Sequence, residues 1–252
     1  MMSTSDDSTT HDAFLGGQLI LGQFRHGYRA GVDPVLLAAS VEARPGQSVL
    51  DLGCGAGAAM LCLGTRIAEL DLHGLEVQPA YAALARVNAG RNGIAATIHE
   101  GDVGRMPPAL RARRFDRVIA NPPYFDRRTG TPSPDTPRET AFGEGVALAD
   151  WIAAGARRLE PRGVMSVIQK SDRLPDLLAA MHGTLGSLRL RPVQPREGRP
   201  AVLVVIEGTK GGRSPARMEA PLILHAGARH TADGDDFSAE ARALLRAGAA
   251  WE

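Results

Sequence analysis

The sequence predicts an α/β protein built on a seven-stranded, mainly parallel sheet with helices on both faces. Three observations support this fold class. Short apolar runs alternate with helical patterns along the chain, which is typical of strand-helix-strand units. A glycine-rich turn at 53–57 follows the first of these runs. Two later runs, 188–193 and 201–207, lie close together, so we expect them to form an antiparallel pair at one edge of the sheet.

The individual elements follow from the apolar runs and the residues that end them. The seven predicted strands span 48–52, 72–77, 96–99, 115–120, 164–169, 188–193 and 201–207. The predicted helices span 35–39, the glycine turn to about 70, 79–92, 148–159 and 174–185. Asp33 is a candidate cap for the first helix, and Pro79 suits the first turn of the third.

We expect one domain over 15–252, preceded by a disordered polar tail at 1–14. Its three parts are an N-terminal hairpin and helix, a core and a C-terminal edge segment, at 15–47, 48–210 and 211–252. The edge segment contains a short apolar strand at 222–225 and an Ala/Leu-rich helix at 239–247. This segment is expected to pack at the edge of the sheet.

Composition excludes several classes of protein. The net charge is +1 and 44% of the residues are apolar, so the chain can build a core but offers no global charge for nucleic acid. Cys54 and Cys62 are too few for a disulfide framework or a zinc site. The chain has no apolar run near the roughly 20 residues that span a bilayer, and its polar, acidic start does not resemble a signal peptide. We therefore expect a soluble, cytoplasmic protein.

Histidine and aspartate residues gather near the C-terminus without a recognisable ligand spacing. They are His225, His230, Asp233, Asp235 and Asp236. Because this arrangement fits no known metal-binding pattern, we expect solvated polar residues and no metal.

The glycine-rich turn carries the first functional signal. Asp51 ends the predicted strand, and Gly53, Gly55 and Gly57 follow it. With Ala58 in the last place, the glycines also satisfy a dinucleotide-binding pattern. A carboxylate at Asp51 would repel a pyrophosphate but attract a cofactor that carries ammonium and sulfonium groups. The pattern therefore favours S-adenosylmethionine, although Asp51 could instead cap a helix.

Two more acidic residues follow the next two strands. Glu76 lies about 20 residues beyond the turn, where an acidic residue can accept hydrogen bonds from ribose hydroxyls. Asp102 could accept the adenine amino group, and Val77 and Val103 are expected to line the same site. The simpler alternatives are a surface role for Glu76 and an Asx turn at Asp102. Since ligands of such sheets bind at the carboxyl ends of the strands, three acidic residues there favour the cofactor.

The fourth predicted strand ends in Asn121, Pro122, Pro123 and Tyr124. The prolines remove two backbone donors, so the Pro122 carbonyl and the Asn121 side-chain oxygen are available to accept hydrogen bonds. Such acceptors suit the two N–H groups of an amine conjugated to a ring. Charge that develops on the nitrogen would strengthen both bonds, and Tyr124 would stack on the ring. The simpler alternative is a purely structural role, as a proline turn beside a core tyrosine.

These motifs resemble those of the class I S-adenosylmethionine-dependent methyltransferases, in which D-x-G-x-G-x-G and N-P-P-Y are defining. The flanking segments 17–39 and 199–212 are similar to those of the small bacterial adenine-N6 methyltransferases of valine tRNA. The resemblance covers about 15–247. It implies an acceptor adenine beside the anticodon of a structured RNA. It also implies that 28–33, from Tyr28 to Asp33, closes over the methionine end of the cofactor.

The N-P-P-Y motif specifies a planar amine without naming it. The alternatives are a ribosomal guanine N2, a DNA adenine, a protein glutamine N5 or a small molecule. The glutamine enzymes usually carry a helical domain before the core, and the guanine enzymes a second copy of the fold. Neither is visible, which favours adenine in RNA, with tRNA as the first candidate. A non-catalytic RNA-binding scaffold that keeps the cofactor pocket is the alternative from another class.

Arginines are expected to form a basic rim around the acceptor pocket. They are Arg111, Arg113, Arg114, Arg117, Arg127, Arg128 and Arg138. Phosphate contacts supply much of the affinity for nucleic acid, although each arginine could equally belong to a solvated face. The long loop 125–145 exceeds the usual connection length, so we expect it to be mobile without RNA and to order over the substrate.

Overall fold

The computed structural model describes residues 8–123, 146–227 and 236–252. The strands of the main sheet are β3 (Ser48–Leu52), β4 (Asp71–Glu76), β5 (Ala96–Glu100), β6 (Phe115–Ala120), β7 (Leu159–Lys170), β8 (Gly186–Gln194), β9 (Leu203–Thr209), β10 (Arg217–Met218) and β11 (Leu222–Ile223). A separate hairpin is formed by β1 (Thr9–Phe14) and β2 (Leu19–Phe24). The helices are α1 (Asp33–Ser40), α2 (Ala58–Arg66), α3 (Pro79–Arg91), α4 (Pro108–Arg111), α5 (Leu148–Arg158), α6 (Leu174–Met181) and α7 (Ala239–Ala247).

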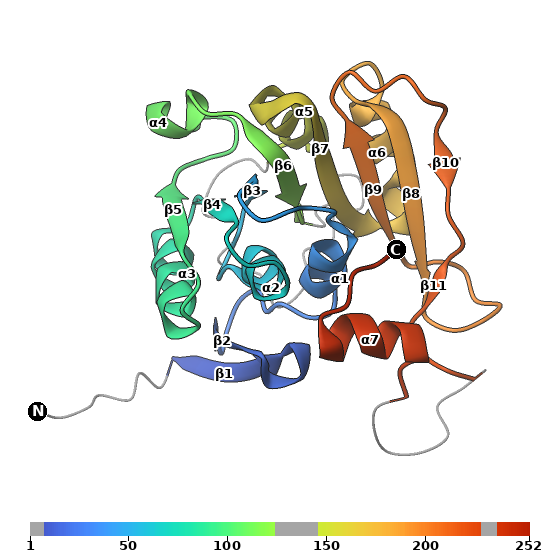
Figure 1. Ribbon diagram of the computed structural model, residues 1–252, viewed down its shortest axis with the longest axis horizontal. Helices are drawn as coiled ribbons and strands as arrows, with labels where there is room; N and C mark the ends of the chain where they lie inside the picture. The colour runs from blue at the N-terminus through green and yellow to red at the C-terminus, as the bar shows by residue number, and fades with distance from the viewer. Residues whose placement is uncertain (1–7, 124–145, 228–235) are drawn as a thin grey trace, which may run out of the picture.

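The sheet runs in the order β5-β4-β3-β6-β7-β9-β8, and both β10 and β11 pair with β8 (Figure 1). Strands β3 to β7 are parallel, whereas β9 runs antiparallel to β7 and β8. The predicted α/β class and the antiparallel pair are thus confirmed. The pair is not the outermost part of the sheet, because the short β10 and β11 add to the far side of β8.

The alternation of side chains along the strands divides the core into two layers. In β6, Ile119 packs with α1, α2, α3 and α7, whereas Val118 and Ala120 pack with α5 and α6. β9 alternates in the same way, with Val205 on the first face and Ile206 on the second. Since neighbouring strand residues point to opposite faces, helices cover both sides of the sheet, as predicted.

The predicted N-terminal tail overlaps a strand of the structure. The expected disordered tail 1–14 is wrong for Thr9–Phe14, which pairs with β2 from Thr9↔Phe24 to Phe14↔Leu19. The polar composition of this segment led to the prediction of disorder. Its polar residues instead make contacts within the fold: Asp12 Oδ2 accepts hydrogen bonds from Gln23 Nε2 (2.8 Å) and Arg29 Nη2 (2.7 Å). The predicted hairpin therefore exists but begins before residue 15.

Several helix boundaries also differ from the prediction. Asp33 is the first residue of α1 and not its cap, because Val32 holds the N-cap position and no side-chain hydrogen bond closes it. Helices α2 and α6 end at Arg66 and Met181, several residues earlier than expected, and α4 was not predicted. The C-terminal segment packs at the sheet edge through β11, as expected, and α7 lies beside the hairpin at the lower margin of Figure 1. In the described residues no helix is long and apolar enough to cross a membrane.

Candidate active site

The predicted functional residues come together at the carboxyl ends of three adjacent strands. Asp51 of β3 lies opposite Gly74 of β4 and Ile119 of β6 in the sheet register. Glu76 is the last residue of β4, and Asn121 directly follows β6. This edge is the one where open parallel sheets bind ligands.

The predicted glycine-rich turn follows β3, and its glycines have positive φ values. Gly53, Gly55 and Gly57 have φ values of +65°, +54° and +90°, a region that L-residues with side chains rarely adopt. A Cβ on Gly53 would lie 2.5 Å from the ring of Trp151 in α5, whereas a Cβ on Gly55 would meet no described atom within 4 Å. The turn is therefore packed on one side and open at Gly55, where a ligand can approach the backbone.

Asp51 has a buried carboxyl group, and one of its two oxygens accepts a hydrogen bond from the backbone. The residue is 2% exposed, and its Oδ2 accepts a hydrogen bond from the backbone N–H of Met60 at 3.3 Å. The alternative role at a helix start is thus partly right, since Met60 lies in the first turn of α2. No hydrogen bond to Oδ1 is found within the described residues. Burial, opposed by the Met60 bond and reinforced by the charge of Glu76, raises the pKa of Asp51 to about 8.

Glu76 is not the surface residue that the simpler alternative requires. It is 6% exposed, and its two oxygens accept backbone N–H groups, Oε2 from Gly55 at 2.9 Å and Oε1 from Gln78 at 2.8 Å. Burial raises the pKa of Glu76 against these bonds. Each carboxylate oxygen retains a lone pair, so the group can still accept two hydroxyl donors. Val77 beside it is 52% exposed and offers an apolar surface at the same edge.

The residues after β5 support the cofactor role less directly. Asp102 Oδ1 accepts the backbone N–H of Gly104 at 2.7 Å, which is the Asx turn of the simpler alternative. The side chain of Val103 is 7% exposed and packs in the second core layer. Any contact of Val103 with a ligand would therefore come from its backbone.

Asn121 is oriented by Tyr28, which approaches from the segment after the hairpin. The Asn121 Nδ2 donates to the Tyr28 hydroxyl at 3.2 Å, so the Asn121 Oδ1 points to the other side of the amide. Among the described residues, no donor reaches that oxygen. Tyr28 is 48% exposed as a residue, but desolvation around its hydroxyl, with the charges of Asp33 and Asp51, raises the pKa of Tyr28 to about 12. The tyrosine therefore stays protonated at neutral pH, and Asn121 keeps an acceptor to offer.

The segment that carries Tyr28 is held by the hairpin and by α3. Gln23 of β2 is 4% exposed, and its Oε1 accepts the backbone N–H of Ala30 at 2.6 Å. The hydroxyl of Tyr81 in α3 donates to the carbonyl of Tyr28 at 3.2 Å. The resemblance placed Tyr28 and Asp33 near the cofactor. In the structure, Asp33 and Asp51 both lie close enough to the Tyr28 hydroxyl for their charges to raise its pKa.

Two residues that are candidates for a functional role were not predicted from the sequence. Asn88 of α3 is fully buried and joins β2 to the glycine turn: its Nδ2 donates to Gly22 O and Ala56 O, both at 2.9 Å, and its Oδ1 accepts from Gly22 N at 2.8 Å. Gln169 of β7 is 1% exposed, and its Nε2 donates to the Pro122 carbonyl at 3.2 Å. The sequence features that could have identified them are a polar residue on the apolar face of a helix, for Asn88, and a polar residue at the end of an apolar strand, for Gln169.

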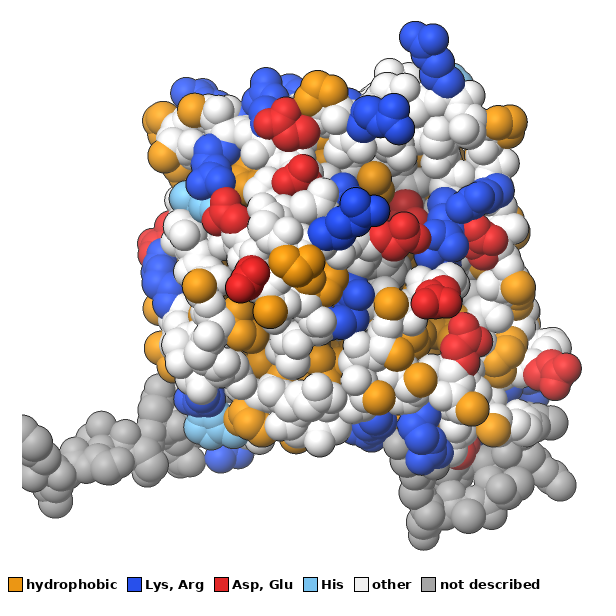
Figure 2. Space-filling view, viewed as in Figure 1, with side chains coloured by type: hydrophobic (Ala, Val, Ile, Leu, Met, Phe, Trp, Pro, Cys, Tyr) orange, Lys and Arg blue, Asp and Glu red, His pale blue; other side chains and the backbone are white. Residues whose placement is uncertain are grey.

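Four of the seven arginines of the predicted basic rim are not at the acceptor end of the sheet. Arg111, Arg113 and Arg114 precede β6, and Arg117 lies near its start, whereas Asn121 follows its end. Arg113 pairs with Asp71 at 2.6 Å, and Arg117 donates to the Glu42 carbonyl at 2.6 Å. On the face in Figure 2, basic and acidic side chains are interspersed. The prediction is wrong for these four arginines because residues close in sequence are separated here by a strand about 20 Å long.

The remaining predictions fall outside the described residues. They concern Tyr124, Arg127, Arg128, Arg138, loop 125–145, His230, Asp233 and Asp235. In the described part of the tail, Asp236 pairs with His225 and Arg196. The described residues contain no group of three or more side chains that could hold a metal ion.

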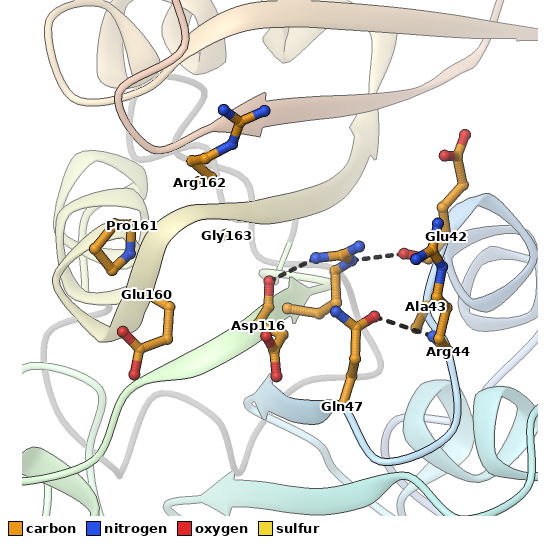
Figure 3. A pocket seen from close by; sticks show the side chains of 10 residues that line it. Glu42, Ala43, Arg44, Gln47, Asp116, Glu160, Pro161, Arg162 and Gly163 are labelled. Atoms are coloured by element: carbon orange, nitrogen blue, oxygen red, sulfur yellow. Dashed lines mark hydrogen bonds between the residues drawn. The ribbon is translucent and has the colours of Figure 1, made fainter.

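A polar cavity of about 530 Å³ lies at the opposite end of the sheet (Figure 3). Its lining comprises Glu42, Ala43, Arg44, Gln47, Asp116, Arg117, Glu160, Pro161, Arg162 and Gly163. Polar groups of this lining bond to one another, as Arg117 Nη1 does to the Asp116 carbonyl at 2.9 Å and Arg44 N to Gln47 Oε1 at 3.0 Å. None of the predicted cofactor or acceptor residues lines it, so this cavity is separate from the candidate active site.

A mainly parallel sheet with a glycine turn, two buried carboxyl groups and an Asn-Pro-Pro segment at one edge defines a class I methyltransferase, whose methyl donor is S-adenosylmethionine. The chain belongs to the methyltransferase small domain family, whose model matches residues 30–189.

Individual relatives extend this similarity over most of the chain. A Porphyromonas gingivalis protein is 33% identical over 193 residues, which are 73% of this chain and 75% of the relative. An Actinobacillus succinogenes protein is 27% identical and covers 77% of this chain and 82% of itself. Both bear the name tRNA1(Val) (adenine(37)-N6)-methyltransferase.

Solved structures give the same fold. A protein from Agrobacterium tumefaciens, titled a predicted O-methyltransferase, superposes with a TM-score of 0.71 at 26% identity, over 87% of this chain and 98% of that one. A Pyrococcus furiosus methyltransferase superposes with a TM-score of 0.56 at 16% identity, over 76% of this chain and 89% of that one, and indicates the fold alone.

Proposed function

We propose that this enzyme methylates the exocyclic N6 amine of an adenine in tRNA, at position 37 of a valine tRNA as in the names of its relatives. The observation that carries the proposal is the Asn121 amide, whose Nδ2 is bound by Tyr28 and whose Oδ1 is left as an acceptor beside Pro122. Two acceptors side by side match the two N–H groups of an adenine amine. Such an enzyme would act in the cytoplasm, where tRNA is found.

The edge of the sheet fits the cofactor. Gly55 leaves open space above its backbone, and Asp51 offers a buried oxygen to a cationic group. Glu76, held by two backbone N–H groups, can accept two hydroxyls of a ribose, and the exposed face of Val77 can lie against an adenine ring. We assign Gly53, Gly57, Asp102 and the backbone of Val103 to the same site. When bound, S-adenosylmethionine supplies an electrophilic methyl group.

The acceptor residues act on the amine. Asn121 Oδ1 and the Pro122 carbonyl accept its two N–H groups, which turns the nitrogen lone pair out of conjugation with the ring. Both bonds strengthen as positive charge develops on nitrogen, so fixed dipoles stabilise the transition state more than the ground state. The nitrogen gains one methyl group and then releases one proton to solvent. Pro123 keeps the segment extended, and Tyr124 is proposed to stack on the base.

The direct test is methyl transfer to tRNA from a strain that lacks the gene, with radiolabelled S-adenosylmethionine and nucleoside analysis of the product. We expect N6-methyladenosine as the labelled nucleoside. Label in N2-methylguanosine, in a 2′-O-methyl nucleoside or in no nucleoside would contradict the proposed acceptor. Transfer to DNA or to a protein glutamine in parallel assays would identify the alternatives.

Substitution of Asn121 tests the proposed mechanism. Asn121→Ala removes one of the two acceptors, and we expect kcat to fall about 10²-fold to 10³-fold, the range for loss of one fixed dipole at a developing charge. Binding of S-adenosylmethionine, measured by calorimetry, should change less than about threefold, since a single lost contact at the edge of its site has a small effect. Retention of wild-type kcat in this variant would refute the assigned role.

A further inference from the structure

We propose that Gln169 is a positioning residue, which holds the Pro122 carbonyl in the orientation that accepts the substrate amine. This inference rests on the proposed function of the Asn-Pro-Pro segment. Gln169 lies near the end of β7, the strand next to β6 on the side away from Asp51 and Glu76.

The amide of Gln169 is fixed at both ends. Its Oε1 accepts the backbone N–H of Lys170 at 3.0 Å, and its Nε2 donates to the Pro122 carbonyl at 3.2 Å. A flipped amide would place an NH2 group against the Lys170 N–H and an oxygen against the Pro122 carbonyl, which are two repulsive contacts. Because the side chain is 1% exposed, water cannot replace these partners. The donor is therefore held towards Pro122.

The Pro122 carbonyl needs such support because its segment has left the sheet. β6 ends at Ala120, and the following prolines have no N–H to anchor the backbone through a ladder. A carbonyl oxygen has two lone pairs. Gln169 occupies one of them and so fixes the direction of the other, which remains for an N–H of the acceptor amine.

The other proposed acceptor, Asn121, is oriented in a similar way by a side chain from another segment. Tyr28 binds the amide of Asn121 at 3.2 Å, and Gln169 binds the carbonyl of Pro122 at 3.2 Å. The two supports come from the segment after the hairpin and from β7, which lie far apart in the sequence. Each of the two proposed acceptors is thus oriented by a side chain outside the Asn-Pro-Pro segment.

A purely structural role for Gln169 makes different predictions from a positioning role. A buried carbonyl needs a donor for stability, and a structural role would lower only the melting temperature. A positioning role lowers kcat, because misplacement of a catalytic group by about 1 Å can cost about 100-fold in rate. The two roles therefore separate in steady-state kinetics.

The first test is Gln169→Met, which keeps the length of the side chain and removes the donor. We expect kcat to fall about 10-fold to 100-fold, with KM for S-adenosylmethionine and for RNA within about threefold of wild type. Ser166→Ala is the matched control, since Ser166 is another buried polar residue of β7 and is expected to keep wild-type kcat. A wild-type kcat in Gln169→Met, or a fall in kcat matched by a rise in KM for S-adenosylmethionine, overturns the proposal.

The second test is Gln169→Glu, whose outcome depends on protonation. The introduced carboxyl group can donate to the Pro122 carbonyl when it is protonated, whereas the ionised carboxylate repels that carbonyl. The kcat of this variant relative to wild type should therefore fall as pH rises. Asp51 and Glu76, whose pKa values are raised, titrate in both enzymes, so the ratio removes their contribution. A ratio that is constant with pH overturns the proposal, even where Gln169→Met does not fold.

Product analysis of the wild-type enzyme, together with the kinetics of both Gln169 variants, distinguishes an error in the proposed acceptor from an error in the role of Gln169. If wild-type enzyme methylates an amine other than adenine N6, the proposed substrate is wrong, and the Gln169 comparison is made on the amine that is methylated. If adenine N6 is the acceptor and both Gln169 variants keep wild-type kinetics, only the positioning role is wrong.

Discussion

Asp51, proposed to bind the cofactor, is a residue whose ionisation lowers the stability of the folded protein. Its carboxyl group is 2% exposed and receives a single hydrogen bond from the described residues, from Met60. Burial raises its pKa to about 8, well above the value of about 3.9 in an unfolded chain. The folded protein therefore binds a proton more tightly than the unfolded chain, and ionisation of Asp51 opposes folding.

Asp51→Asn should stabilise the ligand-free protein. Between about pH 4 and pH 8 the unfolded state binds fewer protons at this residue, so the wild-type free energy of unfolding falls as pH rises through this range. The asparagine variant lacks this loss, which amounts to at most about 5 kcal/mol over the four pH units, so we expect a stabilisation of several kcal/mol at pH 8. Thermal unfolding at pH 5 and pH 8 measures it, and a stability difference that does not grow with pH would contradict the assignment.

The same residue predicts the pH dependence of cofactor binding. A cationic ligand prefers ionised Asp51, so the affinity for S-adenosylmethionine should rise from pH 5.5 to pH 7.5, by at most about tenfold per pH unit. Calorimetry in two buffers should detect release of a proton on binding. Glu76 also has a raised pKa, so Asp51→Asn is the control: its affinity should be weaker and flatter with pH. An affinity that falls over this range would show that Asp51 does not carry the effect.

At the scale of one element, the glycine turn combines a local backbone requirement with a packing requirement. The three glycines share positive φ, which glycine adopts more readily than other residues. Only the structure shows that Gly53 also lies against the Trp151 ring of α5, whereas Gly55 faces open space. The turn is therefore sensitive to substitution for two different reasons.

Gly53→Ala should destabilise the protein more than a matched glycine substitution elsewhere. Its Cβ would lie 2.5 Å from the Trp151 ring, whereas a Cβ on Gly46 at φ +83° would meet no described atom within 4 Å. Gly46→Ala should lose about 1–2 kcal/mol from backbone strain alone, and Gly53→Ala about 1–3 kcal/mol more from overpacking. Urea unfolding of both variants measures the difference. Equal losses would mean that Trp151 moves aside freely.

At the scale of the whole molecule, α3 connects the N-terminal hairpin to the methyltransferase sheet. Asn88 and Asn92, one helical turn apart, bind the backbone of β2 at Gly22 and Ile20 with paired hydrogen bonds of 2.8–2.9 Å. Asn88 also binds the carbonyl of Ala56 in the glycine turn. The hairpin next to the Tyr28 segment and the turn proposed to face the cofactor are thus coupled through one side chain.

Asn88→Ala should weaken both stability and cofactor binding. It removes the partner of the buried backbone groups of Gly22 and of the partly buried carbonyl of Ala56, which is expected to cost about 2–4 kcal/mol, or roughly 4–16 °C in melting temperature for a domain of this size. Asn92→Ala is the control, since its bonds to Ile20 are exposed and it does not touch the turn. We expect a loss under about 1 kcal/mol and unchanged cofactor affinity. Equal effects of the two substitutions would contradict the coupling.

The sequence by itself determined the fold class, the strands β3 to β9 and the identity of the chemistry. These are local properties: strand and helix periodicities are short, and the glycine turn, Asp51 and the Asn-Pro-Pro segment each need only a few neighbouring residues. The same local pattern also fixed which end of each strand carries the site, because strand direction follows chain direction.

The tertiary structure alone decided which partners those residues have. Tyr28 meets Asn121 across 93 positions, Gln169 meets Pro122 across 47, and Asn88 meets Gly22 across 66. It also made β1 a strand despite its polar composition, moved four arginines to the far end of β6, and buried Asp51 deeply enough to raise its pKa to about 8. Such contacts depend on how distant segments pack, and pKa depends on the burial that results. Neither leaves a periodic signal in a single sequence.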